Sequence, residues 1–249
     1  MFPLSRLLLI LSLWAPAWLG AATPLDHVRR ARALLGAETW ARVVRVENAA
    51  PASVYPKTVY ALVFELGGLL WFYTDTDGTQ SFSLHRHNLA AEKADFAPLL
   101  RDIEPGFVAH TILPDDAEEA EAKAEGFPLP HGCLIESYAM LRERAQRGES
   151  IGQSRLLSYH VEGRRIGHTV LLYETARGPR VIDPEAPDRP RRVKRRIAHD
   201  AVEVARSLRP DVAIAQARWL PVHSALEGPL LAQLRRTERA VGPSQVAGS

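Results

Sequence analysis

The stretch HGCLIESYAM, residues 131–140, places the only cysteine of the chain directly after a glycine and at the start of a predicted helix. An apolar stripe at helical spacing follows the cysteine: Leu134, Tyr138, Leu141 and Ala145. Cys133 therefore lies in the first turn, where free backbone N–H groups and the positive end of the helix dipole favour a thiolate over a thiol. The stretch predicts a helix that packs on a core and carries a nucleophile at its N-terminus.

A nucleophilic thiolate needs a base that handles protons and a third group that orients this base. Both occur downstream, in GHTVLLYETARGPRVIDPE at residues 167–185. His168 begins an apolar strand, and Asp183 ends the next predicted strand, which Pro184 stops. We therefore predict a catalytic triad of Cys133, His168 and Asp183.

The geometry of this triad depends on the hairpin between the two strands. A turn near residues 175–176 sets His168 opposite Asp183 on one face of the sheet. The turn-forming residues Arg177 and Gly178 fall past that midpoint, so a stagger or a bulge must bring the two side chains together. Each residue alone also has an ordinary structural explanation: a buried thiol, a strand-end histidine and an Asp-Pro turn.

The order of these residues resembles the transglutaminase-like branch of the papain-like fold. In that branch a cysteine starts a helix, a histidine heads an apolar strand and an Asp-Pro ends the following strand. The corresponding residues are Gly132-Cys133, His168-Thr169-Val170 and Asp183-Pro184, and the resemblance spans residues 128–187. Here the cysteine follows the glycine directly, and Thr169-Val170 stands where an aromatic residue often follows the histidine. The resemblance implies an α+β fold in which a nucleophile helix packs on an antiparallel sheet.

The predicted reaction is hydrolysis of an amide or peptide bond through a thioester on Cys133. His168 gives a proton to the leaving amine, and Asp183 holds the imidazole. The Cys133 N–H and one side-chain donor would stabilise the oxyanion. Four residues are candidates for that donor: His131, Gln80, Trp71 and Tyr73. Hydrolysis is favoured over acyl transfer because water is abundant, whereas an amine acceptor needs its own site.

Two alternatives stay open. The same triad would serve an acyl transferase that crosslinks proteins. A catalytically silent transglutaminase-like module of the cell envelope would instead bind peptides or polymers. The hydrolase and the acyl transferase need a reactive thiol, whereas the binding module does not.

The first 22 residues have the pattern of a secretory signal peptide. Arg6 provides the positive start, residues 7–13 a short apolar core, and residues 20–22 a small-residue cleavage site. The apolar run is short for a membrane span and Pro16 interrupts it, so we expect cleavage rather than anchoring. The protein is then periplasmic or secreted, with no membrane span after cleavage.

Composition is that of an ordinary globular protein, with 46% hydrophobic and 24% charged residues. A formal net charge of +2 argues against nucleic acid as the main partner. One cysteine excludes an intramolecular disulfide. No cofactor and no metal are expected. The basic stretch from Arg189 to Arg196 is either a solvated loop or a contact for an anionic envelope polymer.

The chain is predicted to have four parts: the signal peptide at 1–22, a helix and β-rich region at 23–127, the catalytic core at 128–241 and a disordered tail at 242–249. The strands and helices are grouped in blocks rather than strictly alternating, which indicates an α+β protein. The helices are predicted at 25–35, 89–103, 115–125, 133–147, 198–208 and 226–240.

Overall fold

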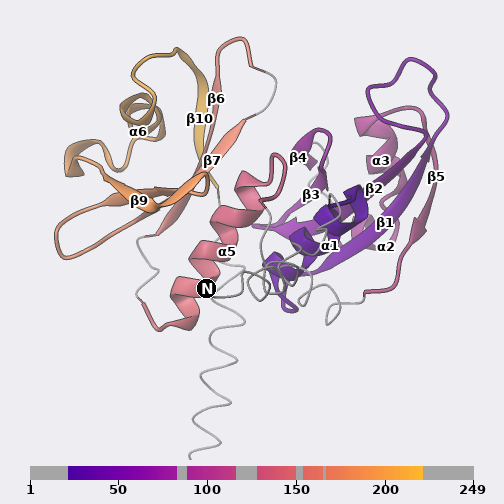
Figure 1. Ribbon diagram of the computed structural model, residues 1–249, viewed down its shortest axis with the longest axis horizontal. Helices are drawn as coiled ribbons and strands as arrows, with labels where there is room; N and C mark the ends of the chain where they lie inside the picture. The colour runs from indigo at the N-terminus through magenta and orange to yellow at the C-terminus, as the bar shows by residue number, and fades with distance from the viewer. Residues whose placement is uncertain (1–21, 83–88, 116–127, 150–153, 165–166, 221–249) are drawn as a thin grey trace, which may run out of the picture.

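The computed structural model describes residues 22–82, 89–115, 128–149, 154–164 and 167–220, which form two five-stranded antiparallel sheets with helices packed on them (Figure 1). The α+β class predicted from the sequence is thus confirmed. Several expectations lie outside the described residues: the signal peptide up to residue 21, most of the helix at 115–125, the helix at 226–240 and the tail at 242–249. No described helix is long and apolar enough to cross a membrane.

The first sheet belongs to the N-terminal half of the chain, and its strand order is β4-β3-β2-β1-β5. Its elements run in the order α1 (Pro24–Leu35), β1 (Ala41–Asn48), β2 (Thr58–Leu66), β3 (Leu69–Thr74), β4 (Gly78–Phe82), α2 (Leu89–Ala94), α3 (Ala97–Ile103) and β5 (Phe107–Ile112). Gly67 and Gly68 form the two-residue turn between β2 and β3, both at positive φ, as the tightest hairpins require. The predicted antiparallel strands of this region are present.

Helix α1 has strong local signals at both ends. The Thr23 hydroxyl accepts the Asp26 N–H, while the Asp26 carboxylate accepts the Thr23 N–H at 2.9 Å, which makes a reciprocal capping box. Pro24 occupies the first turn and Gly36 ends the helix at φ 80°. These signals explain why the predicted helix appears close to its expected bounds.

The second sheet belongs to the C-terminal half, and its strand order is β10-β6-β7-β8-β9. Its elements are α5 (Cys133–Gln146), β6 (Arg155–Val161), β7 (His168–Tyr173), β8 (Arg180–Asp183), β9 (Ala186–Arg192), the short 3-10 turn η2 (Arg195–Ile197), α6 (Ala201–Leu208) and β10 (Ile214–Leu220). Strand β7 begins at His168 and strand β8 ends at Asp183, which are the positions that the predicted triad requires.

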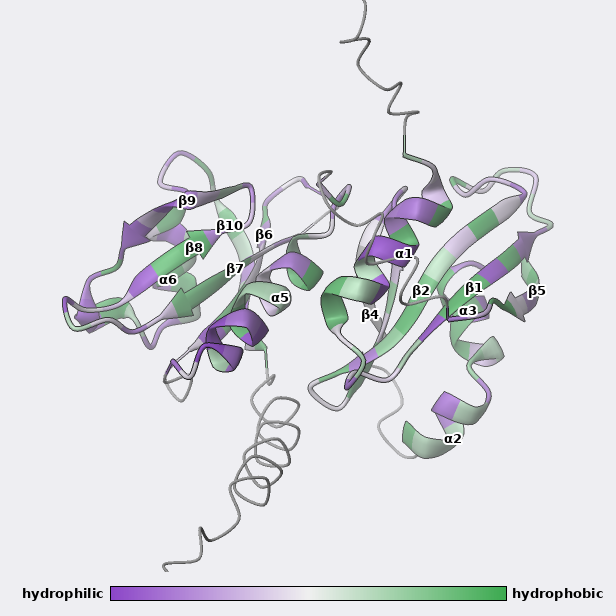
Figure 2. Ribbon diagram, turned by 60° about the horizontal axis from the view of Figure 1, so that its bottom comes forward, coloured by the Kyte–Doolittle hydropathy of each residue, from purple (hydrophilic) through white to green (hydrophobic). Residues whose placement is uncertain are grey.

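Helix α5 lies between the two sheets, and its apolar face joins them in one core (Figure 1). Leu134 and Leu141 belong to one buried cluster that also contains Leu62 of the first sheet and Leu171 of the second. Helix α1 covers the same face of the first sheet, and α3 covers its other face. Helix α6 covers the far face of the second sheet. Green, apolar strands therefore run through both halves in Figure 2.

Three boundary predictions differ from the structure. The helix expected at 89–103 is two helices, because Asp95 accepts the Ala97 N–H at 3.0 Å and Pro98 starts a new first turn. The helix expected from residue 198 begins at Ala201, where Asp200 accepts two N–H groups. The basic stretch from Arg189 to Arg196 begins in strand β9, which forms the edge of the second sheet and ends at Arg192, so only its second half lies outside the strand.

Candidate active site

Cys133 is the first residue of α5 and is held there by a tight approach of the preceding loop. Gly132, the N-cap, is buried, and a Cβ at this position would lie 2.3 Å from the Cβ of Leu129. The Leu129 N–H in turn donates to a carboxylate oxygen of Glu136 in the first turn of α5, at 3.1 Å. Only glycine fits at residue 132, so the loop fixes the point at which the helix begins and thereby the position of the sulfur.

The first sheet supports this loop from the other side. The Tyr73 hydroxyl donates to the Pro130 carbonyl oxygen at 3.1 Å. A Cβ at Gly78, the first residue of β4, would lie 2.7 Å from the Cβ of His131. Burial raises the pKa of Tyr73, so the phenol stays a neutral donor. The N-terminal β region therefore positions the cysteine loop.

The sulfur contacts an open backbone edge of β7. Thr169 donates its N–H to Cys133 Sγ at 3.3 Å and accepts the hydroxyl of Ser137 on its carbonyl at 3.0 Å. In an antiparallel strand the N–H and C=O of one residue point to the same neighbour. Here that neighbour is not strand β8 but helix α5, which offers Cys133 and Ser137 one turn apart.

Thr169 contacts α5 rather than β8 because the ladder of backbone hydrogen bonds between β7 and β8 ends before it reaches Thr169. Its last pair joins Leu171 to Ile182. The same register, continued by two residues, would set Pro184 against Thr169, and a proline has no N–H to donate. Pro184 thus ends the pairing and leaves Thr169 to the cysteine helix.

His168 and Asp183 meet at this open end. The distance from His168 Nε2 to Asp183 Oδ1 is 2.9 Å. Both side chains leave the same face of the sheet, but the register makes them diagonal rather than directly opposite neighbours. The turn is closed by Thr175 and Gly178, whose backbones exchange hydrogen bonds. The stagger expected from the position of the turn residues is therefore present.

The electrostatics of this pair favour the charged forms. Burial alone would lower the pKa of His168, but hydrogen bonds with Asp183 and Cys133, together with the charges of both groups, raise it to about 10. Burial would raise the pKa of Asp183, yet the hydrogen bond and the charge of His168 lower it below the usual value. The imidazole is consequently cationic at neutral pH and suited to pair with a thiolate.

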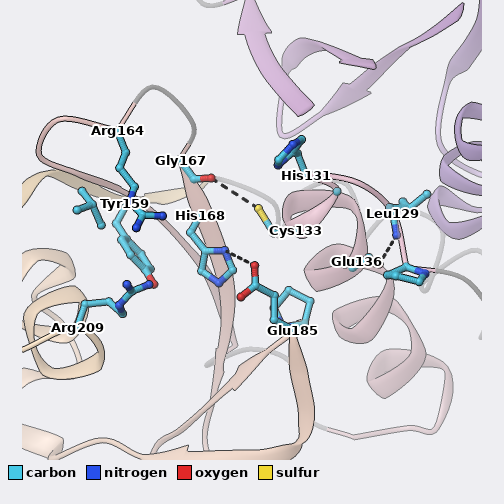
Figure 3. Close-up of a pocket in the computed structure, with 14 residues that line it drawn as sticks. Leu129, His131, Cys133, Glu136, Tyr159, Arg164, Gly167, His168, Glu185 and Arg209 are labelled. Atoms are coloured by element: carbon cyan, nitrogen blue, oxygen red, sulfur yellow. Dashed lines mark hydrogen bonds and ion pairs between the residues drawn. The ribbon is translucent and has the colours of Figure 1, made fainter. Parts of the chain in front are cut away.

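The sulfur and the imidazole open into a cavity of about 660 Å³ (Figure 3). Cys133 and His168 both line it, and Nε2 of the imidazole contacts Asp183, so Nδ1 is the ring nitrogen left for the sulfur. The lining residues are Pro128, Leu129, His131, Gly132, Cys133, Glu136, Tyr159, Val161, Arg164, Gly167, His168, Pro184, Glu185 and Arg209.

The four candidates for the oxyanion donor have different surroundings. His131 is exposed, lines the cavity and has a φ of 53°. Trp71 and Tyr73 do not line the cavity: the Trp71 indole donates to the Leu66 carbonyl at 3.0 Å, and the Tyr73 hydroxyl is engaged by Pro130. The side chain of Gln80 lies outside the described part of the structure. His131 is the candidate that the described geometry leaves at the cavity.

Sequence reasoning did not single out several residues that border the sulfur and the imidazole. Tyr159 packs its ring edge-on against His168, with centroids 5.6 Å apart. Glu185 approaches His168 Nδ1 to 3.9 Å, and Arg164 and Arg209 line the same cavity. No local pattern marks these residues, because they come from four separate places: strand β6, the β6–β7 connection, the β8–β9 turn and the end of α6.

A metal ion has three ligand atoms available here, from His168, Asp183 and Glu185, which lie within 4.8 Å of one another. The two carboxylates face different nitrogens of one imidazole, however, and Asp183 already accepts a hydrogen bond from Nε2. An ion bound by all three would have to displace one of these contacts. The arrangement therefore fits proton transfer better than metal ligation.

Comparison with known proteins finds no match: no family model, no curated protein and no solved structure is significantly similar to this chain.

Proposed function

We propose that this protein is an exported thiol-dependent hydrolase that cleaves an amide or peptide bond through Cys133, His168 and Asp183. The observation that carries the proposal is that a helix-start thiol and an imidazole line one cavity, while the carboxylate of Asp183 holds the other side of the imidazole at 2.9 Å. A papain-like, transglutaminase-like core accounts for the same features: a nucleophile helix packed on an antiparallel sheet, with histidine and aspartate on neighbouring strands.

The reaction begins with the thiolate of Cys133 attacking the substrate carbonyl. The Thr169 N–H, 3.3 Å from the sulfur, and the free N–H groups of the first turn of α5 stabilise the negative charge before the attack. The attack forms a C–S bond and moves the carbonyl electrons to oxygen. The Cys133 N–H faces this oxyanion as part of the helix N-terminus, and His131 is the candidate second donor.

The imidazolium of His168 then protonates the leaving nitrogen, the C–N bond breaks and a thioester remains on Cys133. His168, now neutral, accepts a proton from water as the water attacks the thioester. The C–S bond then breaks, the acid is released, and the Cys133 thiolate and the His168 imidazolium are restored. Asp183 keeps the imidazole oriented through Nε2 and stabilises its cationic form, which agrees with the raised pKa of His168. Each proton that leaves one group is received by another, so the cycle needs no cofactor.

Export is part of the proposal. Its support is the signal pattern at residues 1–22 and the place of Thr23, the predicted first residue after cleavage, at the cap of α1. A free amine at Thr23 would face the Asp26 carboxylate, which already accepts the Thr23 N–H. N-terminal sequencing of protein recovered from the periplasm or the medium tests this step, and an N-terminus at Met1 in that fraction would contradict it.

A contact with an anionic envelope polymer is the partner that the basic residues support. Arg189 and Arg192 lie on the exposed edge strand β9, and Lys194 and Arg195 follow it. With Arg177, the last three of these line a hollow at the end of the sheet away from the cysteine. Such a contact would hold the protein at its substrate and would weaken as salt increases.

The catalytic proposal is tested with a pool of random N-acetylated peptides and a readout of newly released amines. Wild-type protein should release amines, and Cys133→Ser should lose at least about 10³-fold of the rate. His199→Asn, an exposed histidine outside the cavity, is the matched control and should retain full activity. Equal rates for wild type and Cys133→Ser would contradict the proposal.

The two alternatives separate in the same experiment. Incorporation of a labelled amine into protein substrates in preference to hydrolysis would favour an acyl transferase. Peptide binding without amine release or incorporation, together with an unreactive Cys133, would favour the binding module.

A further inference from the structure

Charges are unevenly distributed in the cavity. Arg164 and Arg209 lie on one side of the imidazole together with Tyr159, whereas Cys133 and His131 lie on the other side (Figure 3). Arg164 comes from the connection after β6 and Arg209 from the end of α6, so two separate segments bring a guanidinium to the same wall. A substrate that crosses the sulfur therefore meets a cationic wall beyond His168.

Arg209 has hydrogen-bonding capacity left for a ligand. It is half-buried beside the phenol of Tyr159, and its Nε is 3.9 Å from a carboxylate oxygen of Asp211, a side chain that is 70% exposed. The nearby Asp183 carboxylate is taken by His168. A planar guanidinium presents five N–H groups and matches a carboxylate with two parallel hydrogen bonds, so these neighbours do not saturate it.

Tyr159 fixes the position of Arg209 relative to the chemistry. Its ring contacts His168 edge-on, and burial raises its pKa to about 12, so the phenol remains neutral, and its oxygen accepts a hydrogen bond from the Arg209 guanidinium. The order along the wall is therefore sulfur, imidazole, phenol and guanidinium.

The direction of the substrate follows from the mechanism, on which this inference rests. The leaving nitrogen must lie against His168, because the imidazolium protonates it. The part of the substrate attached to this nitrogen then continues past the imidazole, toward Tyr159 and the two arginines. The acyl part remains on the side of Cys133 and His131.

We infer that the leaving-group side of the cavity binds a carboxylate, and that the protein releases amino acids or short peptides that end in a free carboxylate. Arg209 forms the half-buried contact and Arg164 the exposed one at the rim. Neither arginine touches the scissile bond, so both determine specificity rather than perform the chemistry.

The test compares two pools of random N-acetylated tripeptides, one with a free C-terminal carboxylate and one amidated at the C-terminus. Released amines are measured as kcat/KM. Wild-type protein should prefer the free acids by about 10- to 100-fold, the effect of a charge-assisted hydrogen bond. Arg209→Gln should remove most of this preference, mainly through a higher KM for the acids. Arg209→Lys should restore part of the preference.

Arg206→Gln is the matched control, because Arg206 lies on the exposed face of α6, pairs with Glu203 and does not line the cavity. It should behave as wild type. Equal kcat/KM for acids and amides in wild type, or an unchanged preference in Arg209→Gln, would overturn the inference while leaving the hydrolase proposal intact.

Binding to Cys133→Ser separates the two proposals. In this variant the acid pool should bind more tightly than the amide pool by a similar factor, and Arg209→Gln in the same background should abolish the difference. If turnover fails in the wild type but this preference is present, the subsite is supported and the hydrolase proposal is not. Equal binding of the two pools, or none, overturns the subsite.

Discussion

The two sheets of this protein are built alike but end differently. Each has five antiparallel strands with helices on both faces. In the first sheet the polar groups of two β3 side chains donate hydrogen bonds to backbone carbonyls of the protein: Trp71 to Leu66 and Tyr73 to Pro130. In the second sheet the ladder between β7 and β8 stops early, and a helix start with a thiol meets the open edge.

The comparison shows where chemistry becomes possible in such a fold. A paired strand consumes its own backbone groups, so it has none to offer a nucleophile. Where Asp183-Pro184 ends the pairing, Thr169 has an N–H for the Cys133 sulfur, and His168 and Asp183 extend past the last ladder pair. The first sheet supports the cysteine loop, and the second sheet supplies the imidazole and the carboxylate of the proposed triad.

The largest expected effect contrasts a site residue with a core residue. Asp183→Asn should lower the rate of amine release by about 10²- to 10⁴-fold, because the imidazole loses its orienting carboxylate, and should leave the fold intact. Leu62→Ala, in the first sheet and fully buried, should cost about 2–5 kcal/mol of unfolding free energy with little change in kcat of the folded protein. Steady-state kinetics measures the rate of amine release, and denaturant unfolding measures the loss of unfolding free energy. A large kcat loss in Leu62→Ala would show that the division of roles is wrong.

Strand termination at Pro184 gives the next prediction. Pro184→Ala restores an N–H that can donate to the Thr169 carbonyl in competition with Ser137. Extension of the ladder would pull Thr169 away from α5, and we expect kcat/KM to fall about tenfold with no loss of secondary structure. An activity equal to wild type would mean that the proline is incidental.

His168, in the second sheet, should make the unfolding free energy of the protein depend on pH. The pKa of His168 is raised to about 10 in the folded state, against about 6.5 when unfolded, so its contribution is complete below pH 6.5 and is lost as pH rises toward 10. The unfolding free energy should therefore fall by on the order of 1–3 kcal/mol more in wild type than in His168→Asn between pH 7 and pH 10. Parallel curves would refute the ion pair, and His199→Asn should follow wild type.

The smallest effect is expected at the contact between the first sheet and the cysteine loop. Tyr73→Phe removes the hydroxyl that donates to Pro130 and should cost about 1 kcal/mol in unfolding free energy. The loop should loosen, so kcat should fall by a factor of a few while KM changes less. If kcat is unaffected, the first sheet does not position the nucleophile.

Local patterns in the sequence were sufficient for the elements that carry the triad. The apolar stripe after Cys133 predicts α5, and the apolar runs around His168 and before Asp183 predict β7 and β8, because these signals depend on neighbours within one element. The stagger was expected because Gly178 marks the turn.

Other features depend on segments distant in the sequence, and the sequence alone did not reveal them. Strand β9 was expected as a loop, since Pro190 and several arginines suit an exposed edge but give no strand signal. Trp71 was a candidate for the oxyanion donor by residue type, but its side chain faces the shared core. Arg209 reaches the cavity only through the packing of α6 on the second sheet.

The most direct test of the central claim is the rate at which Cys133 reacts with iodoacetamide at pH 6, since it needs no substrate. If the sulfur, the imidazole and the carboxylate act as one unit, Cys133 should react at least about tenfold faster than free cysteine at that pH, and His168→Asn should remove the advantage. An unreactive Cys133 in the folded wild type, or the same rate in wild type and His168→Asn, would contradict the account.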